Sequence, residues 1–212
     1  MKTVLVSSLR SKLKAISEAQ LLAGNSSPVF FLFILVGALL FGGCKQEKTV
    51  EPADKVQVQG TQINPDPELL TYYSGLDFQT LQELQQARAA TAKYRNINNA
   101  FRDNYQDIAL VMPNMGYHFM KSELVNPVFE ITKPELLVYN KNANGSFELV
   151  AVEYAVPIDP LSPNTAPNGF TGSADEWDFN TLNTGLWTLH AWIWKNNPDG
   201  VFNMTNPLVQ VQ

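Results

Sequence analysis

A single long apolar run, Val29 to Phe41, stops just before the only cysteine of the chain, Cys44. About a dozen apolar or small residues are too few to cross a bilayer core, which takes roughly 20 residues in a helix. The residues before the run carry four basic side chains and one acidic side chain, as in the n-region of an export signal. The run therefore predicts a signal peptide over residues 1–43.

The residues at the end of this run, Phe41-Gly42-Gly43-Cys44, resemble the lipobox of bacterial lipoproteins, although Phe41 stands where that family prefers Leu. In the family, the thiol of the cysteine receives a diacylglycerol and the cysteine becomes the new N-terminus. The resemblance implies that Cys44 is a lipidation site and that the membrane is a partner through a lipid anchor. A buried cysteine in a cytosolic protein and an uncleaved anchor are the alternatives.

The residue after the cysteine, Lys45, bears on which membrane holds the protein. Many bacteria retain a lipoprotein at the inner membrane when Asp stands at this position. The resemblance therefore implies the outer membrane or the cell surface rather than the inner membrane. The location in the bacterial cell envelope is an expectation of the lipobox alone.

The charge of the remaining chain limits its partners. Without residues 1–43 it holds 11 basic and 19 acidic residues, a net charge of about −8. Such a chain repels phosphate backbones, so nucleic acid is not an expected partner. Residues 44–70 are polar and broken by prolines, which is typical of a flexible tether. Residues 71–212 are enough for one domain with its own core.

The first part of that domain is predicted to be helical. Between Asp77 and Leu110, apolar residues recur at spacings of three and four. The pattern predicts one long helix, or two helices with a break near residues 96–99. Thr80 and Glu83 fit a capping box, and Asp77 is the alternative N-cap.

Strands are predicted to follow the helix. Two apolar runs, 135–140 and 147–156, flank an Asn-Gly turn and predict an antiparallel hairpin. Residues 158–185 show no periodicity, which is typical of a functional loop or lid. An aromatic strand, a Pro-Asp-Gly turn and a further strand would close the domain. The fold class is therefore α+β: a long N-terminal helix packed on an antiparallel β-sheet in a single domain.

Both histidines of the chain lie in patterned segments, His118 in a Gly-containing loop after the helix and His190 in the aromatic strand. Strict alternation in the second hairpin strand places Glu153 on the face of Phe147, Leu149 and Ala151. Two imidazoles and one carboxylate suit a catalytic zinc site or a non-haem iron site. His118, Glu153 and His190 are therefore candidate ligands of a divalent transition metal, although the sequence identifies no cofactor. The alternative is a loop histidine, a hydrogen-bonded core histidine and a paired glutamate.

Other residue groups offer further candidates. The four tryptophans all lie in the last third of the domain and could form a ligand platform or belong to the core; they are Trp177, Trp187, Trp192 and Trp194. Asp175, Glu176 and Asp178 could bind calcium or lie solvated at the surface. No nucleophile elbow or phosphate-binding glycine loop is present in the sequence.

Several segments resemble a group of uncharacterised bacterial exported proteins over most of residues 85–208. These segments are PNMGYHFM (113–120), PELLVYN (134–140), LVAVEYAVP (149–157) and LHAWIWKNNPDGVFNMTNP (189–207). A second resemblance, to the oil-body-associated proteins of plants and their bacterial relatives, rests on a histidine segment, a VEY strand and a later tryptophan-histidine strand. It implies a shared fold, and neither group supplies an established catalytic residue.

Two hypotheses of function follow. The first is a lipid-anchored protein whose domain has a binding or structural role in the envelope, with a small molecule or an envelope protein as partner. The alternative is a metal-dependent envelope enzyme that uses His118, Glu153 and His190. In both hypotheses the loop of residues 158–185 shapes the site.

Overall fold

The structure is a computed structural model that describes Tyr73 and residues 75–211, all of which belong to one compact unit. The expected signal peptide (1–43), the lipidation site Cys44 and the tether (44–70) lie outside the described residues. Within the described part, no helix is both long enough and apolar enough to cross a membrane. The mixed α+β class is confirmed, with one six-stranded antiparallel sheet.

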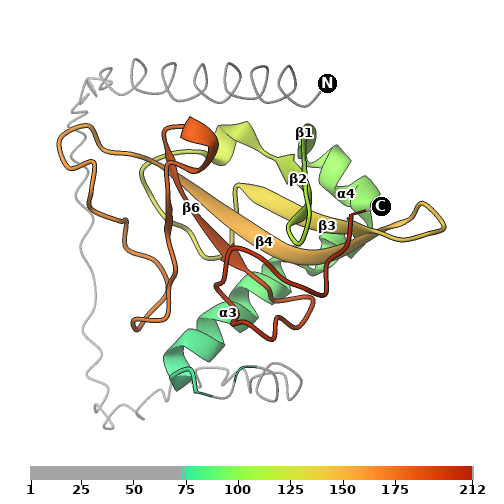
Figure 1. Cartoon of the computed structure of the whole chain (residues 1–212), viewed down its shortest axis with the longest axis horizontal. Helices are drawn as coiled ribbons and strands as arrows, with labels where there is room; N and C mark the ends of the chain where they lie inside the picture. The colour runs from blue at the N-terminus through green and yellow to red at the C-terminus, as the bar shows by residue number, and fades with distance from the viewer. Residues whose placement is uncertain (1–72, 74, 212) are drawn as a thin grey trace, which may run out of the picture. The chain divides into compact units, whose positions relative to one another are not determined.

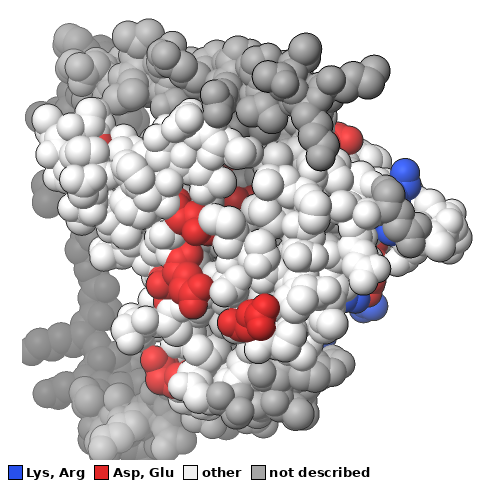
Figure 2. All heavy atoms as spheres, in the orientation of Figure 1, with Lys and Arg blue, Asp and Glu red and all other residues white. Residues whose placement is uncertain are grey.

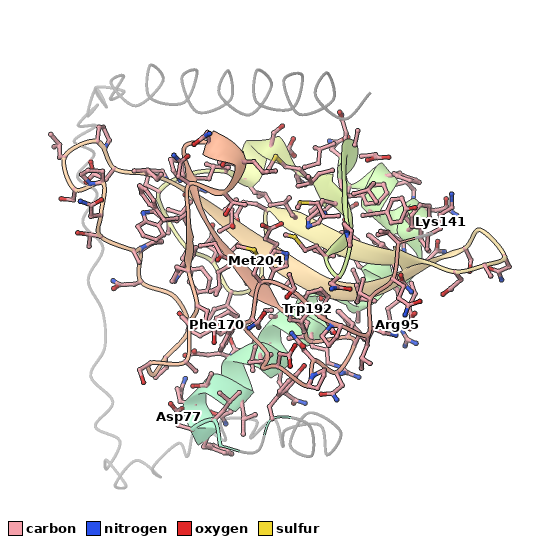
Figure 3. The ribbon with its side chains drawn as sticks, viewed as in Figure 1. Asp77, Arg95, Lys141, Phe170, Trp192 and Met204 are labelled. Carbon is pink, nitrogen blue, oxygen red and sulfur yellow. The ribbon has the colours of Figure 1, made fainter. Side chains whose placement is uncertain are left out.

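The longest helix, α3, runs from Phe78 to Thr91 and begins 77 residues into the chain, so it is not N-terminal in the sequence. It precedes every strand, and in Figure 1 it runs diagonally past the sheet. Asp77 is its N-cap, because its carboxylate accepts a hydrogen bond from the backbone N–H of Thr80 at 2.8 Å. The alternative cap is thus confirmed, and Figure 3 labels Asp77 at the start of the helix.

The predicted capping box is wrong for a specific reason. The side chains of Thr80 and Glu83 bind the loop instead: Thr80 donates to the carbonyl of Thr171, and Glu83 accepts from the N–H and the hydroxyl of Thr171. The two helix residues therefore hold the loop of residues 158–185 against α3.

The helical region is interrupted and shorter than predicted. A 3-10 turn, η1 (Ala92–Arg95), separates α3 from the short helix α4 (Ile97–Arg102). Asn96 caps α4 by accepting from the N–H of Asn98, so the two-helix alternative is confirmed. The helical assignment beyond Arg102 is wrong, because β1 (Gln106–Met112) begins there.

The sheet has the order β1-β2-β3-β4-β6-β5 and is antiparallel throughout. The predicted hairpin is confirmed to within one residue: β3 is Leu136–Lys141 and β4 is Phe147–Pro157. Its turn projects at the right of Figure 1. The remaining strands are β2 (Gly116–Met120), β5 (Asp178–Phe179) and β6 (Leu186–Ala191). A 3-10 turn, η2 (Ser122–Leu124), follows β2.

The two faces of the sheet bury different cores. The face toward α3, called here the helix face, carries the large aromatic and aliphatic core that includes Leu84, Phe119, Tyr139, Tyr154 and Leu189. The opposite face, called here the site face, carries two smaller clusters. Their members are Met120, Val125, Leu136, Ala155 and Leu186 in one, and Val138, Val150, Ala151, Trp192 and Val209 in the other.

An irregularity in β4 overturns the predicted alternation. The pairing with β3 shifts register so that Tyr139 faces Leu149 while Val138 faces Ala151, which leaves Val150 as the extra residue of a bulge. Leu149 consequently packs on the helix face and Ala151 on the site face. Because of the bulge, the first part of β4 packs Leu149 into the core of the helix face, while Glu153 further along the strand points to the site face.

The chain after β6 also differs from prediction. The last strand ends at Ala191, and residues 192–211 contain no strand. The backbone N–H groups of Trp194 and Lys195 both donate to the carbonyl of Val150, at 3.2 and 3.0 Å. This turn carries Trp194 to the helix face, whereas Trp192 stays on the site face.

Candidate functional site

Three polar side chains from three strands meet on the site face. The predicted loop position of His118 is wrong, because this residue lies in the middle of β2, opposite Val138 of β3. Val138 pairs in turn with Ala151 of β4, two residues before Glu153. His190 of β6 lies directly opposite Glu153. The antiparallel register thus brings together residues that are 35 or more positions apart in the sequence.

The distances between these side chains are those of a compact cluster. His118 Nε2 lies 3.6 Å from Glu153 Oε2, and His190 Nε2 lies 3.9 Å from the same oxygen. One ligand atom from each of the three residues falls within 4.8 Å of the other two. The imidazole rings of His118 and His190 are perpendicular, with centroids 5.9 Å apart. A single ion between these atoms could contact all three residues after small side-chain adjustments.

The tautomer of His118 follows from its other nitrogen. Nδ1 lies 3.1 Å from the carbonyl oxygen of Leu110. A carbonyl only accepts hydrogen bonds, so the neutral ring carries its proton on Nδ1 and presents the lone pair of Nε2 to Glu153. At metal centres, a histidine ligand is usually oriented in this way, by a hydrogen bond from its other ring nitrogen to a backbone carbonyl or a carboxylate.

The cluster leaves buried polar atoms without hydrogen-bond partners among the described residues. They are His118 Nε2, Glu153 Oε2 and both ring nitrogens of His190. Each such group costs about 1–3 kcal/mol when nothing replaces its lost hydration. Four of them at one place therefore indicate a site that is built for a ligand, because a sheet that only needed packing would bury apolar side chains here.

Burial keeps both histidines neutral. It lowers the pKa of His118 to about 4, against the opposing effect of its backbone partners at Leu110 and Gly116. It lowers the pKa of His190 to about 3, and the neighbouring His118 acts in the same direction. The distances to Glu153 are within ion-pair range, but desolvation is the largest effect on both histidines. Neutral imidazoles have the free lone pair that metal ions require.

Burial acts on Glu153 in the opposite direction and raises its pKa to about 8. A hydrogen bond from Thr188 lowers this pKa, and the negative charges of Asp178 and Glu135 raise it further. Glu153 therefore holds a proton at neutral pH when no cation lies beside it. A bound divalent cation would favour the carboxylate and displace that proton.

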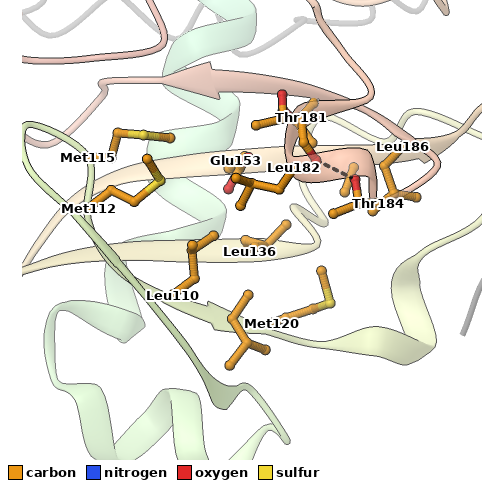
Figure 4. A pocket seen from close by; sticks show the side chains of 13 residues that line it. Leu110, Met112, Met115, Met120, Leu136, Glu153, Thr181, Leu182, Thr184 and Leu186 are labelled. Atoms are coloured by element: carbon orange, nitrogen blue, oxygen red, sulfur yellow. Dashed lines mark hydrogen bonds between the residues drawn. The ribbon is translucent and has the colours of Figure 1, made fainter. Parts of the chain in front are cut away.

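A pocket opens beside Glu153 (Figure 4), and its volume is about 30 Å³. Its wall is mostly apolar, with side chains from β1, β2, β3, β4, β6 and the 3-10 turn η3 (Thr181–Asn183). The lining residues are Ile108, Leu110, Met112, Met115, Met120, Leu136, Glu153, Ala155, Thr181, Leu182, Thr184, Leu186 and Thr188. The predicted functional loop therefore does contribute to the site, through η3 and the residue that follows it.

The four tryptophans lie in different packing environments, which favours the core alternative. Trp192 is fully buried on the site face, where its ring lies nearly parallel to that of His190, at 14° with centroids 5.7 Å apart. Trp187 packs on Phe179, and Trp177 packs near Phe129. Trp194 lies on the helix face with two arginine guanidinium groups 4.6 and 5.5 Å from its ring centroid. The four rings form no common platform and serve mainly as packing.

The acidic residues after Ala174 do not assemble a second centre. Among the residues that the structure describes, the only group of three potential ligands close enough to share an ion is His118, Glu153 and His190. Burial raises the pKa of Asp175 and of Asp178 to about 6, with both carboxylates about half-buried. Figure 2 shows acidic side chains spread over the viewed face and basic ones at its right edge.

Comparison with known proteins adds no assignment. No protein-family model, no curated protein and no solved structure matches the chain.

Proposed function

We propose that this protein binds one divalent transition metal ion through His118, Glu153 and His190. The observation that carries the proposal is the convergence of unpartnered buried nitrogen and oxygen atoms from three strands within 4.8 Å. Two neutral imidazoles and a carboxylate are the ligand set of several catalytic metal centres. The antiparallel sheet holds the three side chains rigidly, as such a centre requires.

The proposed metal centre would have open coordination positions, because the chain supplies three ligands. When bound, a metal ion at such a site polarises water or another small ligand. Glu153 lies in the wall of the pocket, so a small molecule could approach from that side. This arrangement supports the hypothesis of a metal-dependent enzyme over that of a purely structural protein.

We further propose that the protein is a lipoprotein of the bacterial cell envelope. The lipobox-like residues before Cys44, the short apolar run and the tether-like composition of residues 44–70 support this location. In this proposal residues 71–212 form one α+β domain outside the membrane, and the outer membrane or cell surface is favoured over the inner membrane.

The metal proposal is tested by elemental analysis of the purified protein, prepared without a histidine tag. We expect close to one equivalent of a transition metal in the wild type and less than about a tenth of that in His118→Gln and His190→Gln, since each substitution removes a ligand. A wild-type protein that takes up no transition metal from added zinc, iron(II), manganese or copper would contradict the proposal.

Glu135→Gln provides a matched control. Glu135 is as buried as Glu153, but its carboxylate accepts a hydrogen bond from the N–H of Ala155 at 3.0 Å and is no part of the cluster. The Glu135 variant should keep its metal, and Glu153→Gln should lose it. If both variants lost their metal equally, the loss would reflect a general disturbance of the fold rather than the removal of a ligand.

The lipid anchor has a separate test. We expect Cys44→Ser to abolish labelling by a radioactive fatty acid and to release the protein from the membrane fraction. The substitution lies outside the described domain, so the metal content of the released protein should be unchanged. Continued labelling of the variant would exclude the lipoprotein proposal and leave the metal proposal untouched.

A further inference from the structure

The approach to the cluster is restricted to one side. The side chains of His118 and His190 are 0% and 1% exposed, whereas that of Glu153 is 7% exposed. Of the three, only Glu153 lines the pocket. A ligand that reaches an ion at this site therefore comes through the pocket, past the glutamate.

The lining of the pocket selects an apolar ligand. Its side chains are aliphatic or thioether groups, apart from three threonines and Glu153 itself. The Thr184 hydroxyl already donates to the carbonyl of Thr181 at 3.0 Å, and Thr188 hydrogen-bonds Glu153. A polar molecule in the pocket would lose its hydration without full replacement, which is unfavourable.

The size of the pocket restricts the ligand further. A volume of about 30 Å³ holds roughly two water molecules, since each needs at least about 10–15 Å³. Sugars, nucleotides and peptides are far larger. The three methionines in the wall, Met112, Met115 and Met120, can adjust their rotamers but leave its character apolar.

The ligand set adds the last constraint. Two histidines and one carboxylate with open positions form the usual centre of non-haem iron(II) proteins that bind dioxygen. A small apolar pocket beside that ligand set fits dioxygen by size, polarity and coordination chemistry.

We propose that the pocket beside Glu153 admits dioxygen to a metal ion held by His118, Glu153 and His190. This inference rests on the proposed metal site and specifies the ligand of its open position. The pocket supplies the route, and its apolar wall excludes charged and bulky molecules.

Nitric oxide is the probe, because it is a diatomic molecule of similar size and forms a high-spin iron–nitrosyl complex with a distinctive electron paramagnetic resonance spectrum. The full chain is purified in detergent, loaded anaerobically with iron(II) and titrated with nitric oxide. We expect one nitrosyl per bound iron. Iron that is bound without forming this complex would overturn the inference while the metal proposal stood.

A pocket-filling variant tests the route. Ala155 is fully buried in the pocket wall, and Ala155→Val adds two methyl groups there while all three ligand residues are kept. We expect unchanged iron content and an affinity for nitric oxide at least about tenfold weaker, because occupying the pocket then forces overpacking. Ala87→Val, an equally buried alanine of α3 on the helix face, is the control and should bind nitric oxide as the wild type does.

The remaining outcomes separate the two proposals. If the Ala155 variant binds iron and nitric oxide like the wild type, the pocket is not the route and the inference is overturned. If the wild type binds another transition metal but no iron, the inference is overturned while the metal proposal stands; if it binds no transition metal at all, both fail. Xenon, an apolar atom, then reports on the pocket alone: xenon-129 resonance shifts in the wild type that are lost in Ala155→Val would show an apolar cavity without a metal function.

Discussion

A Glu153→Gln variant is expected to be more stable than the wild type when both are free of metal at pH 7, by about 3 kcal/mol in the free energy of unfolding. Burial raises the pKa of Glu153 to about 8 in the folded protein, against an ordinary value of 4.5. The folded state therefore binds a proton more tightly than the unfolded state. Its contribution to stability is complete below pH 4.5 and is lost as the pH rises toward 8. Glutamine carries no such dependence.

Urea unfolding in the presence of a chelator measures this effect. The difference in the free energy of unfolding between the variant and the wild type should be small at pH 5 and should grow as the pH is raised to 8. Over this range the unfolded wild type loses the proton of Glu153, whereas the folded wild type retains it up to about pH 8. Glu135→Gln is the control that separates stability from binding. The pKa of Glu135 is also raised to about 8 by burial, so this variant should show a similar pH trend but retain the metal.

The order of stabilities should reverse when metal is added. An ion present at a thousand times its dissociation constant stabilises the wild type by about 4 kcal/mol, because it binds the folded state only. The Glu153 variant gains little, since it lacks the carboxylate ligand. The contrary result would be a variant that is less stable than the wild type under metal-free conditions at pH 8. It would show that the Glu153 carboxylate stabilises the fold through its own hydrogen bonds, and that it is not a metal ligand whose burial destabilises the metal-free protein.

The parts of the fold that the sequence predicted are those set by local patterns. The hairpin of β3 and β4 could be placed because an Asn-Gly turn separates two apolar runs, and its observed bounds differ by one residue at most. The start of α3 could be narrowed to two candidate caps, of which the alternative, Asp77, is the observed N-cap. Both signals depend on residues that are neighbours in the chain.

The errors arise where tertiary contacts override such patterns. The periodicity that suggested helix beyond Arg102 continues into β1, whose Ala109 adopts a left-handed backbone at φ 57° within an irregular pairing with β2. The bulge at Val150 interrupts the alternation of β4, and no glycine or proline near Val150 indicates it in the sequence. Strand alternation counted from the sequence alone therefore misplaced Leu149 relative to Glu153.

The candidate site was predictable in its composition but not in its geometry. Two histidines and a buried-looking glutamate suggested a metal centre, because few other residue sets supply such ligands. Their convergence depends on the strand order β2-β3-β4-β6 and on registers that no local signal fixes. The pocket was predictable only in part: the loop of residues 158–185 was expected to shape the site and supplies η3, but β1, which forms another part of the wall, falls in a segment predicted to be helical.

The largest effect of an apolar substitution is expected at Trp192. Its side chain is fully buried, its ring lies against that of His190, and its Nε1 donates to the carbonyl of Asn203 at 2.7 Å. Trp192→Ala should lower the free energy of unfolding by about 3–5 kcal/mol, which is usual for a large aromatic side chain removed from a core. It should also weaken metal binding, because His190 has no hydrogen-bond partner among the described residues and relies on this ring for its orientation.

Two further variants separate packing from positioning. Trp192→Phe retains an aromatic ring beside His190 and should recover most of the metal affinity, although the hydrogen bond to Asn203 is lost. Trp194→Ala removes packing from the helix face, where the ring contacts α3 and its Nε1 donates to the hydroxyl of Thr91, and should reduce stability without changing metal affinity. Metal titrations of the three folded variants below their unfolding temperatures measure the difference. If Trp192→Ala binds metal as tightly as Trp194→Ala, the strand alone positions His190 and the stacked ring has only a packing role.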